Sequence, residues 1–195
     1  GEVDGFEREL GDELCARAEL TCEWVTNEWD SIIPNLVSGN YDTIIAGMSI
    51  TEERKEVVSF TQGYTRPSPS AYAALSDVDV NSAVVSAQAS TIQSSHVAST
   101  GATLVEFPTP DETIAAVTAG EVDAVMADKD FLTPIVEETE LQFIAEDVFL
   151  GDGIGMAFRQ SDDELRAKFD AAIDTMKADG SLNALLDKWE IEGKF

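Results

Sequence analysis

An arginine stands in the first turn of a predicted helix, where its positive charge is unexpected. In AGMSITEER (46–54), Thr51 is a suitable N-cap, and the two glutamates that follow it suit the positive end of the helix dipole. Arg54 opposes that dipole. Because a guanidinium binds a carboxylate through two parallel charge-assisted hydrogen bonds, Arg54 is predicted to hold a ligand carboxylate. The alternative is an ion pair with Glu52, Glu53 or another surface carboxylate.

An aspartate stands at the end of a predicted strand in the second half of the chain. Asp128 closes AGEVDAVMAD (119–128), and ligands of open parallel sheets gather at the carboxyl ends of strands. A carboxylate there offers an acceptor to an ammonium group. Together with Arg54 it would match the backbone of a free α-amino acid. The alternative is that Asp128 caps the next helix.

Three further residues offer contacts to such a ligand. Ser90 and Thr91 follow the predicted strand at 82–88 and offer hydroxyl and backbone N–H groups. Their alternative role is to cap a helix that runs toward Val97. Trp29 offers an aromatic wall; it could equally belong to the core or staple the following helix.

The elements that position these residues occur twice. Trp29–Ala46 aligns without gaps on Pro110–Ala127, 81 residues later, and a capping Asp, a turn Gly, a pre-strand Asp and a strand-end Ala all coincide. The alternative is chance similarity between two ordinary helix–turn–strand units. The coincidence of all four positions favours two lobes built on one plan.

The chain alternates helical and strand patterns, which predicts an α/β fold with largely parallel sheets. Helices are expected at 6–17 and after Asp30, strands at 22–25 and 43–46, and two amphipathic helices after Ser161. Segments rich in proline or glycine predict two crossings between lobes. The predicted hinge segments are 64–69 and 151–155. Lobe 1 is predicted to comprise 1–66 plus 155–195, and lobe 2 to comprise 69–152.

Composition excludes several classes of function. With 12 Lys plus Arg against 38 Asp plus Glu, the net charge of −26 would repel nucleic acid and anionic lipid. His96 is the only histidine and there is no GxSxG, CxxC or phosphate loop, so we expect no hydrolase triad, no metal and no cofactor. Cys15 and Cys22 form an even pair, which favours a disulfide and an oxidising compartment over two buried free thiols.

The chain resembles the periplasmic amino-acid-binding proteins of ABC importers, solute-binding proteins that include the lysine/arginine/ornithine and histidine binders. The resemblance runs nearly end to end, and the block around SITEER is its most specific part. It is carried by GFERELGDELC (5–15), CEW (22–24), WD (29–30) before IIPNL, GNYD (39–42), AGMSITEERKEVVSF (46–60), AGEVDAVMAD (119–128), GDGIGMAFR (151–159), DG (179–180) and KW (188–189).

The resemblance implies a two-lobed type II periplasmic-binding-protein fold with a two-stranded hinge. It implies that Arg54 binds the α-carboxylate with help from Gly47, Ser49 and Thr91, and that Asp128 binds the α-ammonium. Trp29 would cover the ligand side chain. It also implies a disulfide where Cys15 and Cys22 stand.

In function, the resemblance implies a monomeric, periplasmic or extracellular protein that binds a free polar or cationic L-amino acid and delivers it to the membrane subunits of an ABC permease, without catalysis. The alternatives are an enzyme resembling cyclohexadienyl dehydratase, with Asp128 or Asp130 as the acid, and a receptor sensor domain. The chain departs from the family in three places. A first strand and loop are not seen before 6–17, so a missing N-terminal segment is expected; Ala46 replaces a serine common in binders of cationic ligands; and Ala89 replaces a glycine.

Overall fold

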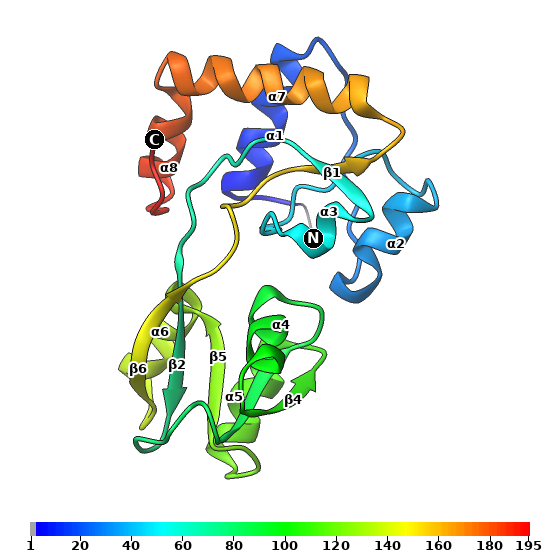
Figure 1. Ribbon diagram of the computed structural model, residues 1–195. Coiled ribbons are helices and arrows are strands. Elements are labelled where there is room, and N and C mark those ends of the chain that lie inside the picture. The colour runs from blue at the N-terminus through cyan, green and yellow to red at the C-terminus, as the bar shows by residue number, and fades with distance from the viewer. Residues whose placement is uncertain (1–2) are drawn as a thin grey trace. The chain divides into compact units, whose positions relative to one another are not determined.

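The computed structural model describes residues 3–195; Gly1 and Glu2, the first residues of predicted lobe 1, lie outside the described residues. The chain divides into two compact units, each of which mixes helices with strands, as an α/β protein should (Figure 1). Unit 1 comprises Gly1–Pro67 and Gly151–Phe195, and unit 2 comprises Ser68–Leu150.

Three helices make the main core of unit 1. Helix α1 spans Phe6–Arg17, α7 spans Asp163–Ala178 and α8 spans Ser181–Lys188, so the predicted helix at 6–17 and the two C-terminal helices are confirmed. Spacing of three to four residues puts their large apolar side chains on one face of each helix. The buried set is Phe6, Leu10, Leu14, Phe169, Ile173, Met176, Leu182 and Leu186.

The strands of unit 1 are few. β1 (Val58–Phe60) pairs antiparallel with β7 (Ala157–Arg159), and Ile44 makes a single bridge to Ala157. The strands predicted at 22–25 and 43–46 do not form, since a strand needs a paired neighbour and Val25 is 60% exposed.

Short helices connect these pieces of unit 1. They are the 3₁₀ turn η1 (Trp29–Ser31), α2 (Ile32–Val37) and α3 (Glu52–Lys55). Asp30 lies inside η1, and Ser31 occupies the N-cap position of α2, so the prediction that Asp30 caps this helix was wrong by one residue.

Unit 2 holds a five-stranded sheet in the order β4-β3-β5-β2-β6. β3 runs parallel to β4 and β5, whereas β2 is antiparallel to β5 and β6. The prediction of largely parallel sheets is therefore confirmed for β3, β4 and β5 and wrong for β2 and β6, and it is also wrong for the antiparallel β1–β7 pair of unit 1. The strand bounds are β2 Pro69–Ala74, β3 Val84–Gln88, β4 Thr103–Phe107, β5 Ala124–Asp128 and β6 Gln142–Phe149.

Helices cover both faces of this sheet. Alternation along β2 sends Ala71 and Ala73 to one face and Tyr72 and Ala74 to the other. The first face packs on α5 (Pro110–Thr118) and α6 (Lys129–Glu138), and the second packs on α4 (Ile92–Ser99).

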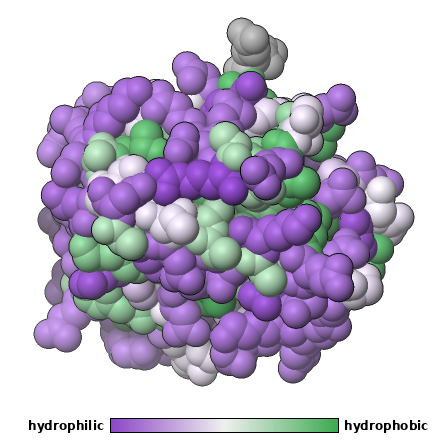
Figure 2. Space-filling view, turned by 90° about the horizontal axis from the view of Figure 1, so that it is seen from above, coloured by the Kyte–Doolittle hydropathy of each residue, from purple (hydrophilic) through white to green (hydrophobic). Residues whose placement is uncertain are grey.

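The surface agrees with the acidic composition. The face seen in Figure 2 is mostly hydrophilic, and its hydrophobic residues occur in small groups. Within residues 3–195, no helix combines the length and the hydrophobicity needed to span a bilayer.

Candidate functional site

Arg54 is held by its own unit in a defined position. The Thr51 hydroxyl accepts a hydrogen bond from the Arg54 amide at 3.1 Å, which caps α3 as predicted. The guanidinium Nη1 donates to the carbonyl oxygen of Ser49 at 2.8 Å, and the guanidinium carbon lies 5.5 Å from the centre of the Trp29 ring. Burial lowers the pKa of Arg54 from its usual value, an effect that the Glu53 carboxylate opposes. Unit 1 therefore brings Trp29, Ser49 and Arg54 together.

The alternatives for Arg54 and Trp29 are partly resolved. The carboxylate of Glu52 pairs with Lys55 at 2.7 Å, so Glu52 is engaged by a different cation. Trp29 is partly buried and packs against a core cluster that includes Leu36 and Met48, while its ring also lies near the guanidinium. Trp29 thus contributes to the core and retains a ring contact with the candidate carboxylate-binding group.

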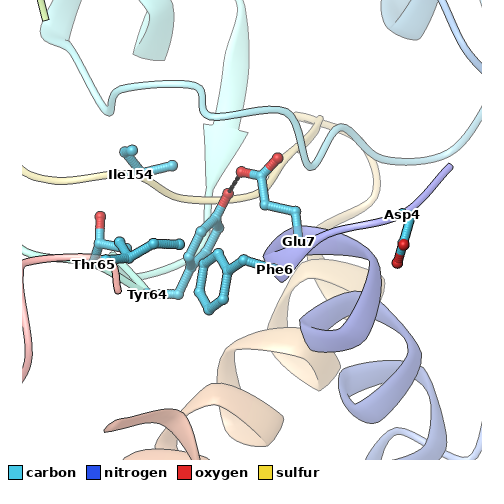
Figure 3. Close-up of a pocket in the computed structure, with 7 residues that line it drawn as sticks. Asp4, Phe6, Glu7, Tyr64, Thr65 and Ile154 are labelled. Carbon is cyan, nitrogen blue, oxygen red and sulfur yellow. Dashed lines mark hydrogen bonds between the residues drawn. The ribbon is translucent and has the colours of Figure 1, made fainter. Parts of the chain in front are cut away.

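The Gly47 amide, a predicted ligand donor, is already hydrogen-bonded. Its N–H donates to Glu7 Oε1 at 2.5 Å, and the Tyr64 hydroxyl donates to the same oxygen (Figure 3). Gly47 has φ +62°, a left-handed conformation that favours glycine. Burial raises the pKa of Tyr64 well above its usual value, with a further contribution from the Glu7 carboxylate. The sequence placed Tyr64 in a predicted hinge segment and Glu7 in a predicted helix, but it did not predict the contact between them.

A cavity of about 300 Å³ lies next to this contact within unit 1. None of the predicted ligand-binding residues lines it. Its walls are Asp4, Phe6, Glu7, Tyr64, Thr65, Ile154 and Ile191, most of which Figure 3 labels.

Asp128 ends β5 in unit 2, immediately before α6. Its side chain makes no capping bond to α6; instead its Oδ1 accepts a hydrogen bond from Gln93 Nε2 at 2.9 Å. The capping alternative is therefore wrong. Desolvation of the carboxyl raises the pKa of Asp128, the Gln93 hydrogen bond opposes this rise, and the nearby Asp130 carboxylate adds to it.

Thr91 does cap a helix. Its hydroxyl accepts from the Ser94 amide at 3.1 Å, at the start of α4, and donates to the Gln88 carbonyl at 2.7 Å. Ser90 is exposed and has φ +60°, so it forms the tight turn that leads into the helix. The capping interpretation is confirmed for Thr91, and its backbone N–H remains the candidate ligand contact.

Gln93 was missed from the sequence. It is buried on the face of α4 that also carries Val97, four residues on, and its Nε2 also donates to Ser70 Oγ at 3.0 Å. The available signal was this helical spacing, which places an amide on a face that otherwise packs on the sheet.

Cys15 and Cys22 form a disulfide, so the free-thiol alternative is wrong. Within the part of the chain that the structure describes, no three His, Cys, Asp or Glu side chains group as metal ligands.

The chain thus forms two α/β units, with Arg54 in the first turn of α3 in unit 1 and Asp128 at the end of β5 in unit 2. Residues 1–192 match the bacterial extracellular solute-binding proteins, family 3, and the chain belongs to that family.

Three similar proteins illustrate the family. A crystal structure of a periplasmic His/Glu/Gln/Arg/opine family-binding protein from Silicibacter pomeroyi, in complex with lysine, is 66% identical and superposes with a TM-score of 0.91 over 97% of this chain and 88% of that one. The L-arginine-binding protein of Pseudomonas aeruginosa is 29% identical, and the histidine-binding periplasmic protein of Salmonella typhimurium is 30% identical. Each of these two alignments covers 97% of this chain and 80% of the relative.

Proposed function

We propose that this protein binds a free L-amino acid, with Arg54 taking the α-carboxylate and Asp128 taking the α-ammonium. The observation that carries the proposal is the placement of the two charges. Arg54 is anchored on the carbonyl of Ser49, after the repeated strand segment of unit 1, and Asp128 ends the corresponding strand of unit 2. Asp128 accepts from a neutral amide, which orients the carboxylate without neutralising it.

The remaining predicted residues complete the proposed contacts. Gly47, Ser49, Ser90 and Thr91 supply hydrogen bonds to the amino-acid backbone, while Ala46 and Trp29 line the space for its side chain. Gly47 can do so only if its amide leaves Glu7, its present acceptor.

A cationic side chain is the proposed specificity. The 66% identical relative was solved with lysine, and two curated relatives are named for arginine and histidine. The net charge of −26 also attracts cations to the protein by long-range electrostatics.

The proposed role in transport depends on closure of the protein around the bound amino acid. One amino acid held by groups from both units supplies the interaction that only a closed form makes, and hinge segments at 64–69 and 151–155 would permit that closure. We propose that lobe 1 (1–66 plus 155–195) and lobe 2 (69–152) then present the closed monomer to an ABC permease, in the periplasm or outside the cell.

Calorimetry with L-lysine, L-arginine, L-histidine and L-glutamate tests this function. We expect tight binding of one or more cationic amino acids and its loss in Arg54→Ala. Arg166→Ala is the matched control, because Arg166 pairs with Asp163 on α7 and is not among the predicted site residues. Wild-type affinity in a folded Arg54→Ala variant would refute the proposal.

A dehydratase activity is the second candidate. The raised pKa of Asp128 is what an acid catalyst needs, and Lys129, which could have opposed it, pairs with Asp147 at 2.6 Å. Incubation with prephenate or arogenate, followed by NMR, separates the two: turnover that Asp128→Asn abolishes supports the enzyme, and unchanged substrate supports a binding protein.

A further inference from the structure

We infer that Gln93 is a positioning residue that orients the Asp128 carboxylate toward the α-ammonium of the ligand, an inference that rests on the proposed binding function. Gln93 is 7% exposed and lies in the first turn of α4. Its amide connects that helix to two strands of the sheet, because it donates both to Ser70 on β2 and to Asp128 on β5.

The sheet register explains why this amide can hold the carboxylate. Ser70 and Asp128 are directly paired in the antiparallel ladder between β2 and β5. Ser70 is 2% exposed, so its hydroxyl is a fixed acceptor next to the aspartate. The Gln93 amide nitrogen carries two hydrogens, one for each of these acceptors. The Ser70 contact therefore sets the orientation of the amide, and the amide in turn sets the orientation of Asp128.

The start of α4 holds the other end of Gln93. Thr91 caps the helix through the Ser94 amide and donates to the Gln88 carbonyl, so the backbone on both sides of Gln93 is tied down. A buried glutamine with both amide hydrogens engaged has little freedom to turn. Its position is thus determined by contacts from α4, β2 and β5.

An amide suits this task better than a charged group. Lysine at 93 would neutralise Asp128, and glutamate would place a second negative charge beside it and favour protonation. A neutral donor to Oδ1 directs Oδ2 to the ammonium and preserves the negative charge that the ammonium needs. The same hydrogen bond favours the ionised carboxylate, against the desolvation and the Asp130 charge that oppose ionisation.

The test is the affinity for L-lysine measured by calorimetry between pH 4 and pH 8. Gln93→Leu keeps the approximate size of the side chain and removes both donors. At pH 7 we expect it to weaken binding about 10- to 100-fold, the range for a lost hydrogen bond to a charged group. The loss of affinity on acidification should also begin at a higher pH than in wild type, because Asp128 becomes easier to protonate.

Gln62→Leu is the matched control. Gln62 also donates its amide to an aspartate, Asp174, at 2.8 Å, but this pair lies in unit 1 among residues that no part of the site uses. We expect its affinity and pH profile to match wild type. Ser70→Ala is a milder second variant, which keeps the Gln93–Asp128 bond but frees the amide, and a smaller weakening is expected.

Four outcomes separate the hypotheses. Affinity within twofold of wild type in folded Gln93→Leu, with an unchanged pH profile, would overturn the role of Gln93. Should Gln93→Leu fail to fold, unchanged binding in Ser70→Ala would overturn it. Asp128→Asn is measured alongside: its retained binding would refute the proposed function itself, whereas its loss together with normal Gln93→Leu binding would refute only the positioning role.

Discussion

The repeated segments 29–46 and 110–127 fold into the same turn but not into the same strand. Each helix ends in the same three backbone hydrogen bonds, and the glycine of each turn has positive φ, +90° at Gly39 and +74° at Gly120. In unit 1 the amides of Ser38, Gly39 and Asn40 donate to the carbonyls of Pro34, Leu36 and Asn35, respectively. In unit 2 the equivalent amides of Ala119, Gly120 and Glu121 donate to the carbonyls of Ala115, Val117 and Ala116.

The flanking elements differ because their surroundings differ. In unit 2, Thr109 and Glu112 form a capping box at the start of α5, and β5 is paired on both sides. In unit 1, α2 has six residues and no side-chain cap, and the strand is reduced to one bridge at Ile44. A turn is made by local bonds, whereas a strand exists only where neighbours pair with it.

The two segments also end in different chemistry. In unit 1, Gly47 follows the strand-end alanine and contributes a left-handed backbone and an amide, whereas in unit 2 Asp128 occupies that place and contributes a charge. One plan therefore ends in two different chemical groups, which in the proposed function would contact the two ends of one amino acid.

The largest expected effect comes from removing the charge that distinguishes the second segment. Asp128→Asn keeps the shape but leaves the ammonium without a counter-charge, and we expect lysine affinity to fall by at least about 30-fold, since breaking such a pair costs 2–5 kcal/mol. Calorimetry measures this. Asp123→Asn is the control: that carboxylate accepts from the Val84 amide, so the variant should lower the melting temperature and leave affinity unchanged.

A second difference between the units is the disulfide, which only unit 1 contains. Replacing Cys15 and Cys22 by alanine should lower the free energy of unfolding by about 2.5 kcal/mol, the chain-entropy value for so short a loop. Urea denaturation measures the loss. Hydrogen exchange should show the loss as weaker protection in α1. Equal weakening in strands β3 and β5 would contradict the expectation that the disulfide stabilises unit 1 alone.

Equal substitutions in the two turns test whether they are equivalent. Gly39→Ala and Gly120→Ala should each destabilise by about 1–2 kcal/mol, the penalty for a side chain in the left-handed region. A Cβ at either position would meet no atom within 4 Å, so the measured loss reports backbone strain and not a steric clash of the new side chain. Urea unfolding of both variants should give similar losses; a large difference would mean that the turns are held differently.

The smallest expected effect is a dependence of unit 1 stability on pH. Hydrogen bonds from Ser181, followed by Arg17, lower the pKa of Asp179 to about 2 from its usual 3.8. A depressed carboxyl pKa stabilises the folded state above pH 3.8, and that contribution is lost as the pH falls toward 2. Asp179→Asn should therefore reduce the fall in melting temperature over this interval, and an unchanged fall would contradict the assignment.

Local signals predicted much of the fold. The spacing of Phe6, Leu10 and Leu14 predicted α1, and Thr51 predicted the cap of α3. The same kind of signal was insufficient at 22–25, where an apolar pattern had no neighbouring strand to pair with. Helices carry their hydrogen bonds within themselves, so periodicity finds them more reliably than it finds strands.

The site shows the same division. The sequence by itself determined the helix start at Thr51 with Arg54 in its first turn, the glycine turns of the repeat and the position of Asp128 at the end of a strand. Only the tertiary structure decided that Asp128 leaves its helix uncapped and accepts from Gln93, 35 residues earlier in the chain. That contact depends on the register of β2 against β5 and on the packing of α4 against the sheet. Both are contacts between segments far apart in the chain, which no local sequence pattern encodes.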